Sequence, residues 1–251
     1  MEMPTFCDWT LRRSEGNRTA MSYTLHIADP GYSSWSMRAG LILARTDIPH
    51  DLVIHRMYVD TPLTAQIGLP PARTVPVLVT PDGTAIRDSL AIAEEIASRH
   101  PDSGIWPSQP ALRASARSLA AEMHASFTAL RAQCPMCLRV AYEDVPVPDD
   151  LAADLSRLEE IWSDALERSG GPWLAGTWSA ADAFFAPVAA RIAGYGLPVG
   201  PVSAAYASRH LRDPSFIAWR SMALREGPDL HDTVYRQPFP RAGWPDAVHP
   251  A

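Results

Sequence analysis

The sequence predicts a small mixed α/β domain followed by an all-α domain. Three observations support this. Short β-type and helical segments alternate up to about residue 100, helical periodicity dominates from residue 110 onward, and a proline-containing stretch separates the two regions. The length of 251 residues corresponds to one or two domains, and a hydrophobic content of 47% is enough to build a core without a metal or disulfide.

The first domain is predicted from short alternating elements. Strands are expected over residues 23–28, 52–56, 75–80 and 84–87, and helices over residues 34–45 and 89–98. The turn Pro81-Asp82-Gly83 joins the last two strands into a hairpin. The connection between residues 56 and 75 has no clear pattern.

The second domain is predicted to consist of helices, over residues 110–133, 149–168, 180–195, 202–210 and 213–224. Ser179 and Asp182 fit a capping box, and Asp213 stands before a proline at the first helical position. We therefore divide the chain into a disordered N-terminal extension (1–20), an α/β domain (21–100), a linker (101–109), a helical domain (110–227) and an irregular C-terminal tail (228–251).

Composition excludes several functions. The net charge is −6 and every basic residue is arginine, which argues against non-specific nucleic-acid binding and against chemistry that needs a lysine amine. Cys7, Cys134 and Cys137 are too few, and odd in number, for a disulfide framework. No signal peptide or membrane span is recognisable, so we expect a cytoplasmic protein without a membrane partner.

The first candidate site residues are Ser33 and Ser34, which follow the first predicted strand and open the first helix. Small hydroxyl residues at this position usually cap the helix. The positive end of a helix also favours an anion, and a thiol placed there ionises more easily. A serine hydroxyl can then donate a hydrogen bond to the sulfur.

Two further candidate sites lie at the start of a predicted strand and at the start of the next predicted helix. Pro76 begins a strand that is predicted to be buried, where a residue without an N–H is unexpected. A cis Val75–Pro76 bond would explain it, because Val75 could then offer its backbone to an extended peptide. The alternative is a trans proline in an edge strand. Asp88 and Ser89 open the next helix. They either cap it or hold the ammonium and carboxylate of an amino-acid-like ligand.

The order and spacing of these segments resemble those of the soluble glutathione S-transferases. The resemblance rests on Tyr32-Ser33-Ser34-Trp35-Ser36-Met37-Arg38, Thr74-Val75-Pro76-Val77-Leu78 and Asp88-Ser89-Leu90-Ala91-Ile92, and in the second half on residues 171–182 and 213–219. It covers about residues 22–224, and the Ser-Ser-Trp-Ser form is similar to bacterial serine-type members near the zeta class.

The resemblance implies a thioredoxin-like glutathione-binding domain, a helical bundle domain and a homodimer. It implies that Ser33, or the adjacent Ser34, stabilises the glutathione thiolate, that Val75 at the Pro76 turn pairs with the glutathione backbone, and that Asp88 and Ser89 hold its γ-glutamyl end. The activity implied is glutathione transfer to a small electrophile in detoxification, by conjugation or a zeta-like isomerisation. Glutathione is the co-substrate, and no metal is expected.

Two other functions stay open. Asp88 stands where the family often has Glu or Gln, and lysine is absent, so a non-catalytic interaction protein is one alternative. A glutathione-dependent reductase using Cys134 and Cys137 is another, although a redox Cys-x-x-Cys normally opens a helix after a strand. Arg38 and Arg191 could form buried ion pairs or bind a carboxylate, and the ion pair is the more ordinary outcome.

Overall fold

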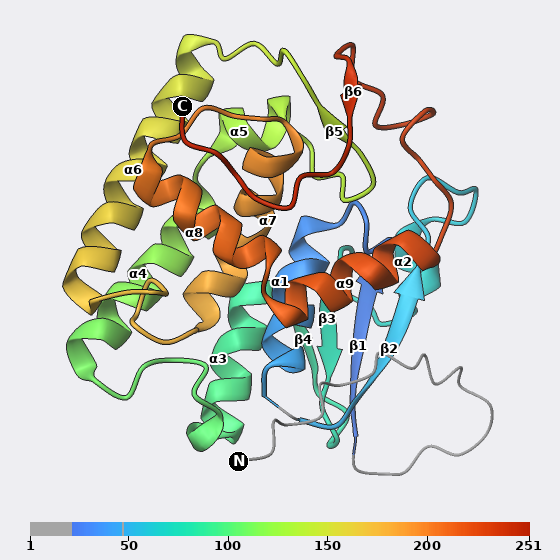
Figure 1. Ribbon diagram of the computed structural model, residues 1–251. Helices are drawn as coiled ribbons and strands as arrows, with labels where there is room; N and C mark the ends of the chain where they lie inside the picture. The colour runs from blue at the N-terminus through green and yellow to red at the C-terminus, as the bar shows by residue number, and fades with distance from the viewer. Residues whose placement is uncertain (1–21, 47) are drawn as a thin grey trace.

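A four-stranded mixed sheet forms the centre of the first domain (Figure 1). The computed structural model describes residues 22–46 and 48–251, so the predicted extension 1–20 lies outside the described residues. The strands are β1 (Tyr23–Ala28), β2 (His50–His55), β3 (Val77–Val79) and β4 (Ala85–Arg87), in the order β2-β1-β3-β4. β1 and β2 are parallel, whereas β3 runs antiparallel to both β1 and β4.

The four predicted strands are present; β1 has the predicted bounds, and the ends of the other three are shifted. β3 begins at Val77 rather than at Val75, because Pro76 has no N–H to give to the ladder. Helices α1 (Ser34–Ala44) and α3 (Ser89–Arg99) match the prediction and pack against each other. The connection without a clear pattern contains a short helix, α2 (Leu63–Ile67), which ends at Gly68 with a positive φ of 63°.

The second domain is helical, as predicted. Its helices are α4 (Pro110–Ala125), α5 (Thr128–Gln133), α6 (Asp149–Ser169), α7 (Ala180–Gly194), α8 (Pro201–Leu211) and α9 (Pro214–Arg225), and one 3-10 turn, Pro101–Ser103, precedes them. The first domain meets this bundle chiefly through α1, which contacts both α7 and α9, and also through α3, which contacts α4 (Figure 1).

The prediction of one helix over residues 110–133 is wrong. The chain breaks between α4 and α5, where Phe127 takes a left-handed conformation with φ of 60°. Asp154 on α6 accepts a hydrogen bond of 2.9 Å from the backbone N–H of Leu130, which supplies a partner for the first turn of the new helix. A tertiary contact therefore overrides a continuous helical periodicity.

Helix α7 is the buried centre of the bundle, since each of its residues is buried. Its start confirms the predicted capping box between Ser179 and Asp182. The Asp182 carboxylate is fully buried and also accepts the backbone N–H of Leu174 at 3.1 Å and the hydroxyl of Tyr206 at 2.8 Å. These partners satisfy a carboxylate that would otherwise be costly to bury.

The C-terminal segment folds back onto the bundle. It contains a two-residue strand, β6 (Arg241–Ala242), which pairs antiparallel with β5 (Ala141–Tyr142), so the expectation of a wholly irregular tail needs this correction. Leu230 and His231 are buried. Within residues 22–46 and 48–251, no helix combines the length and the apolar character that crossing a bilayer requires.

His210 on α8 predicts a loss of stability in acid. Burial, followed by the charges of Arg45 and Arg209, lowers its pKa to about 3, and Nε2 has no hydrogen-bond partner. Below pH ~6.5 the unfolded chain takes up a proton that the folded chain refuses, so folding stability falls as the pH falls through this window. Between pH ~6.5 and ~5 this group removes about 1.5 kcal/mol.

The test compares urea unfolding of the native chain and of His210→Leu at both pH values. The variant has a similar volume and no titrating ring, so its stability should fall by about 1.5 kcal/mol less over the same range. Equal pH dependence of the two proteins would contradict the assignment.

Candidate functional site

The three predicted site segments converge at one end of the sheet. In the register of the strands, His26 of β1 lies opposite Val77 of β3, and Val77 lies opposite Arg87 of β4. Because β3 is antiparallel to both neighbours, its beginning lies beside the ends of β1 and β4. The segment that leads to Ser33, the Val75–Pro76 turn and the Asp88–Ser89 pair therefore meet at the same sheet end.

Ser33 caps the N-terminus of α1. Its hydroxyl accepts the backbone N–H of Ser36 at 3.3 Å and donates to the Ser36 hydroxyl at 2.8 Å, which in turn accepts the N–H of Ala28 at 3.1 Å. The cap thus joins the helix to the end of β1. Ser33 is 8% exposed.

The start of α1 retains its positive electrostatic character. The first turn contains no acidic residue that would neutralise the helix dipole. Ser34, the first helical residue, is half-buried, and its hydroxyl makes no hydrogen bond to a described residue. The start of a helix with free N–H groups favours an anion, and Ser33 and Ser34 both lie at this start.

Val75 offers an unpaired backbone. The Val75–Pro76 peptide bond is cis, as one of the two sequence interpretations required. Val75 precedes β3 and is half-buried, and its N–H and C=O make no backbone hydrogen bond within the described part of the chain. An extended ligand could pair with both groups.

Asp88 and Ser89 open α3. Asp88 caps the helix, because Oδ1 accepts the backbone N–H groups of Leu90 at 2.7 Å and Ala91 at 3.2 Å. Its other oxygen, Oδ2, lies 3.4 Å from Nε2 of His124 on α4. Ser89 is fully buried, and its hydroxyl has no hydrogen-bond partner. A buried hydroxyl without a partner at a helix start is a candidate contact for a ligand carboxylate.

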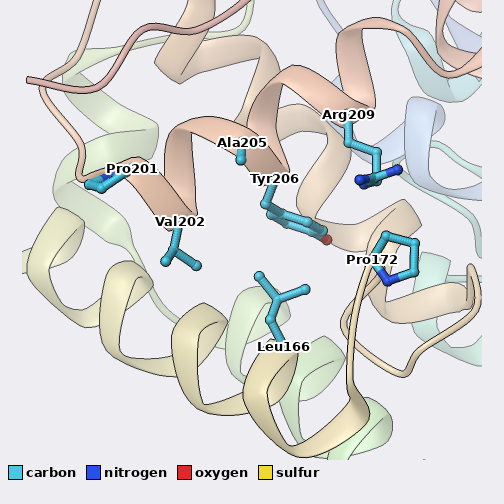
Figure 2. Close-up of a pocket in the computed structure, with 7 residues that line it drawn as sticks. All are labelled: Leu166, Pro172, Pro201, Val202, Ala205, Tyr206 and Arg209. Atoms are coloured by element: carbon cyan, nitrogen blue, oxygen red, sulfur yellow. The ribbon is translucent and has the colours of Figure 1, made fainter.

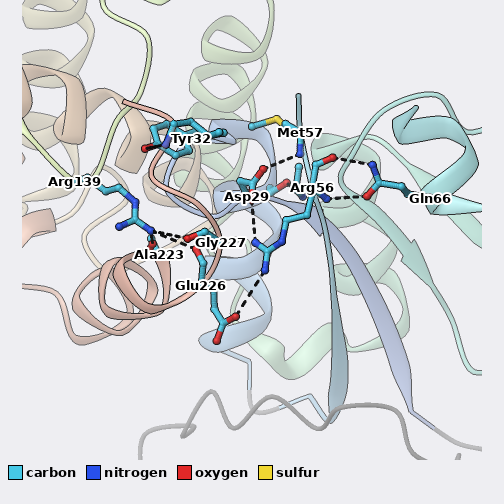
Figure 3. A network of polar contacts seen from close by, with 12 residues as sticks. Asp29, Tyr32, Arg56, Met57, Gln66, Arg139, Ala223, Glu226 and Gly227 are labelled. Carbon is cyan, nitrogen blue, oxygen red and sulfur yellow. Dashed lines mark hydrogen bonds and ion pairs between the residues drawn. The ribbon is translucent and has the colours of Figure 1, made fainter. Parts of the chain in front are cut away.

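A polar network that the sequence analysis missed supports the loop between β1 and α1 (Figure 3). The buried carboxylate of Asp29 accepts hydrogen bonds from Arg56 at 3.0 Å and from the backbone of Met57 at 2.7 Å. Gln66 in α2 holds the Arg56 backbone through two bonds of 2.8 Å. Asp29 also accepts, through its backbone carbonyl, the N–H of Ser33 at 3.0 Å, so the network fixes where α1 begins.

The C-terminal tail holds Tyr32, the residue before the cap. The Tyr32 hydroxyl donates to Asp229 and accepts the backbone N–H of Leu230, both at 2.9 Å, and its ring stacks on Tyr235 at 4.6 Å. Burial raises the pKa of Tyr32 above its ordinary value. This hydroxyl is engaged by the tail, which leaves Ser33 and Ser34 as the candidates for contact with a ligand.

The two cysteines of the helical domain are poor redox groups. Cys134 and Cys137 are buried and free, and burial raises the pKa of both thiols, that of Cys134 to about 11. Reactive cysteines have depressed pKa values and are partly exposed. Among the described residues, no three His, Cys, Asp or Glu side chains gather as a metal site would need.

A separate groove of about 390 Å³ lies between α6 and α8 (Figure 2). Its walls include Leu166, Pro172, Val202 and Tyr206, with Arg209 at one side. The hydroxyl of Tyr206 is already donated to Asp182 at 2.8 Å. This groove contains none of the predicted site residues.

Comparison with known proteins identifies a domain family for part of the chain and the fold of the whole. Residues 32–99 match the family model described as glutathione S-transferase, N-terminal domain. No curated protein matches the sequence. Among solved structures, a glutathione transferase homologue from Burkholderia with bound glutathione is similar, at 21% identity and a TM-score of 0.62, covering 82% of this chain and 100% of that one.

Two further structures have the same fold. Glutathione transferase Omega 1C from Trametes versicolor is 22% identical with a TM-score of 0.62, covering 82% of this chain and 94% of that one. Ure2p in complex with glutathione is 14% identical with a TM-score of 0.63, covering 80% and 99%. The thioredoxin-like sheet domain and the helical domain together therefore form the glutathione transferase fold. Residues 32–99 therefore match the N-terminal domain of the glutathione S-transferases, and the whole described chain shares the fold of the solved glutathione transferases.

Proposed function

We propose that this protein is a glutathione transferase that activates the glutathione thiol at the N-terminus of α1. The main support for this proposal is that the start of α1, the Val75 backbone and the start of α3 lie at the same end of the sheet. A tripeptide laid across this end would place its sulfur at Ser33 and its γ-glutamyl group at Ser89. The bacterial serine-type subclass, the homodimer and the cytoplasmic location remain predictions.

Activation follows from electrostatics. A free thiol with a pKa near ~8.5 is mostly protonated at neutral pH. A helix N-terminus favours the thiolate, and a hydroxyl that donates a hydrogen bond to the sulfur adds to this. The α1 start supports this role, because it has no acidic residue in its first turn. We assign the donor to Ser33, with the neighbouring Ser34 hydroxyl as the other candidate.

Glutathione would be held by backbone and side chain together. The unpaired N–H and C=O of Val75 suit the cysteinyl backbone, in the manner of an added strand. The Asp88 carboxylate suits the γ-glutamyl ammonium group, and the unpartnered Ser89 hydroxyl suits the adjoining carboxylate. The thiolate then attacks an electrophilic carbon in a second substrate, by conjugation or isomerisation.

The Asp88→Asn variant tests glutathione binding separately from folding. Asparagine caps a helix about as well as aspartate, so α3 should stay intact while the negative charge is lost. We expect glutathione affinity, measured by calorimetry, to fall about 10-fold with little change in thermal unfolding. The exposed Asp102→Asn is the matched control and should bind as the native chain does.

Turnover with chlorodinitrobenzene decides between the proposed function and its rival. Binding of glutathione with conjugation supports the transferase. Binding without turnover of any electrophile in a panel would favour the non-catalytic interaction protein. No heat on titration of reduced glutathione into folded protein would refute both the site and the function. The burial of Cys134 and Cys137 argues against the reductase.

A further inference from the structure

Three arginines from different helices gather beside the candidate site without an acidic partner. They are Arg38 on α1, Arg131 on α5 and Arg191 on α7. Their charges act on one another: burial, then the charges of Arg191 and Arg131, lower the pKa of Arg38 to about 9, against a smaller opposing effect of the Asp88 charge. In the described part of the chain, no carboxylate lies within ion-pair distance of any of the three. The buried ion pairs that were the ordinary expectation for Arg38 and Arg191 are therefore absent among these residues.

Arg38 lies at the centre of this cluster. It is 1% exposed, and its guanidinium carbon lies 4.2 Å from the ring centre of Trp35 and 4.9 Å from that of Phe184. The guanidinium thus lies over two aromatic rings, which attract its charge but accept none of the hydrogen bonds that its N–H groups offer in the guanidinium plane. Its Nε and one terminal nitrogen have no hydrogen-bond partner. A buried charged donor without an acceptor is costly, and a ligand with acceptor oxygens would remove that cost.

The other two arginines are only partly satisfied. Arg191 donates to the backbone carbonyls of Cys134 and Pro187, which are neutral acceptors and do not balance its charge. One terminal nitrogen of Arg131 donates to the carbonyl of His124, near the end of α4, and to that of Ser126, which follows α4, and its other donors have no described partner. Arg131 is half-buried, so it can be reached by a ligand.

Trp35 connects the cluster to the candidate site. The guanidinium carbon of Arg131 lies 4.7 Å from the same indole that Arg38 contacts. Trp35 directly follows Ser34 in the first turn of α1, and Arg38 follows one turn later on the same helix face. Positive charge thus surrounds a side chain next to the hydroxyl groups that we assign to the thiol. The Asp88 carboxylate, which caps α3 and faces His124, acts on Arg38 and raises its pKa, but no ion pair joins the two side chains.

We propose that Arg38 and Arg131, which both lie over Trp35, form a carboxylate subsite to which the buried charge of Arg191 adds, and that the electrophilic second substrate is an organic acid. This inference rests on the proposed function, because it names the substrate class of the same site. Arginine offers a planar set of donors that matches the two oxygens of a carboxylate. In the reaction the thiolate sulfur bonds to the electrophilic carbon, and for an aryl chloride the C–Cl bond breaks and chloride leaves with the electron pair. The carboxylate itself is unchanged.

Two aryl chlorides test the substrate class. One is chloronitrobenzoate with the nitro group ortho and the carboxylate para to chlorine, and the other is the corresponding carboxamide, which lacks the charge. Each kcat/KM is divided by the uncatalysed rate with glutathione, which corrects for intrinsic reactivity. We expect the native protein to prefer the acid by about 10- to 100-fold, as charge-assisted hydrogen bonds would give.

Variants of Arg131 assign that preference to the cluster. Arg131→Gln should reduce the acid-to-amide ratio to near one, and Arg131→Lys should restore part of it by restoring the charge. Arg168, an exposed arginine paired with Asp164 on α6, provides the control. Arg168→Gln should leave the ratio as in the native protein. A ratio near one in the native protein, or the native ratio in Arg131→Gln, would overturn the inference.

A binding measurement keeps this test independent of turnover. Calorimetry with meta-nitrobenzoate and meta-nitrobenzamide, neither of which has a chloride to lose, should give at least ~10-fold tighter binding of the acid. If the acid binds but no aryl chloride is converted, the proposed function fails and the anion subsite stands. If the acid and the amide bind and react alike, the subsite fails and the transferase stands.

Discussion

Replacing Ser33 with alanine should lower kcat/KM for glutathione conjugation by about 10- to 100-fold, the factor expected when a hydrogen bond to a charged atom is lost. The pKa of bound glutathione, read from thiolate absorbance against pH, should rise at the same time. Affinity for glutathione should change little, because the γ-glutamyl contacts at α3 are untouched. The variant also loses the cap of α1, so unfolding should become easier by about 1 kcal/mol.

The neighbouring Ser34→Ala provides the matched control. Its hydroxyl caps nothing and makes no hydrogen bond to a described residue, so its loss should not change stability. If Ser33 is the donor, Ser34→Ala keeps most of the activity. Full activity in Ser33→Ala with a large loss in Ser34→Ala would transfer the role to Ser34. Full activity in both variants would refute hydroxyl activation.

Replacing Gly40 with alanine should destabilise the protein by about 3 kcal/mol or more, although alanine is the better helix former by about 1 kcal/mol. Gly40 lies within α1, and an added Cβ would come 2.0 Å from Cζ3 of Trp219 on α9. Trp219 is fully buried, and its indole N–H donates to the carbonyl of Pro30 at 3.0 Å. The ring therefore has no free space into which it could move.

Urea denaturation of Gly40→Ala against the native chain measures this effect. The loss should be accompanied by reduced activity, since Pro30 belongs to the loop that leads to Ser33. Gly243 in the tail is the control, because an added Cβ there meets no atom within 4 Å. Gly243→Ala should unfold within about 0.5 kcal/mol of the native chain. Equal stability of the native chain and Gly40→Ala would show that α1 and α9 pack less closely than described.

Local sequence patterns were sufficient to predict most helices and strands and to choose the segments of the candidate site. The strands and most helices follow from period and turn residues, and the capping box at Ser179 follows from two side chains three positions apart. The same holds for Ser33 at the start of α1 and Asp88 at the start of α3, because a helix cap is a local event. The break of the predicted 110–133 helix at Phe127 could not be predicted, because it depends on Asp154 of another helix.

The sequence by itself determined the two-domain division, the order of the elements and the residue types at three helix and strand starts, since these depend on neighbours close along the chain. The tertiary structure decided which contacts bring the starts of α1, β3 and α3 together and which side chains surround them. The hydrogen bond between Tyr32 and Asp229 joins residues that are 197 positions apart in the sequence. Arg38, Arg131 and Arg191 likewise come from three helices, and the lack of an ion pair between them and a described carboxylate is a property of packing. Charge balance and side-chain packing depend on which residues lie close together in space, so they can be determined only once the fold is known.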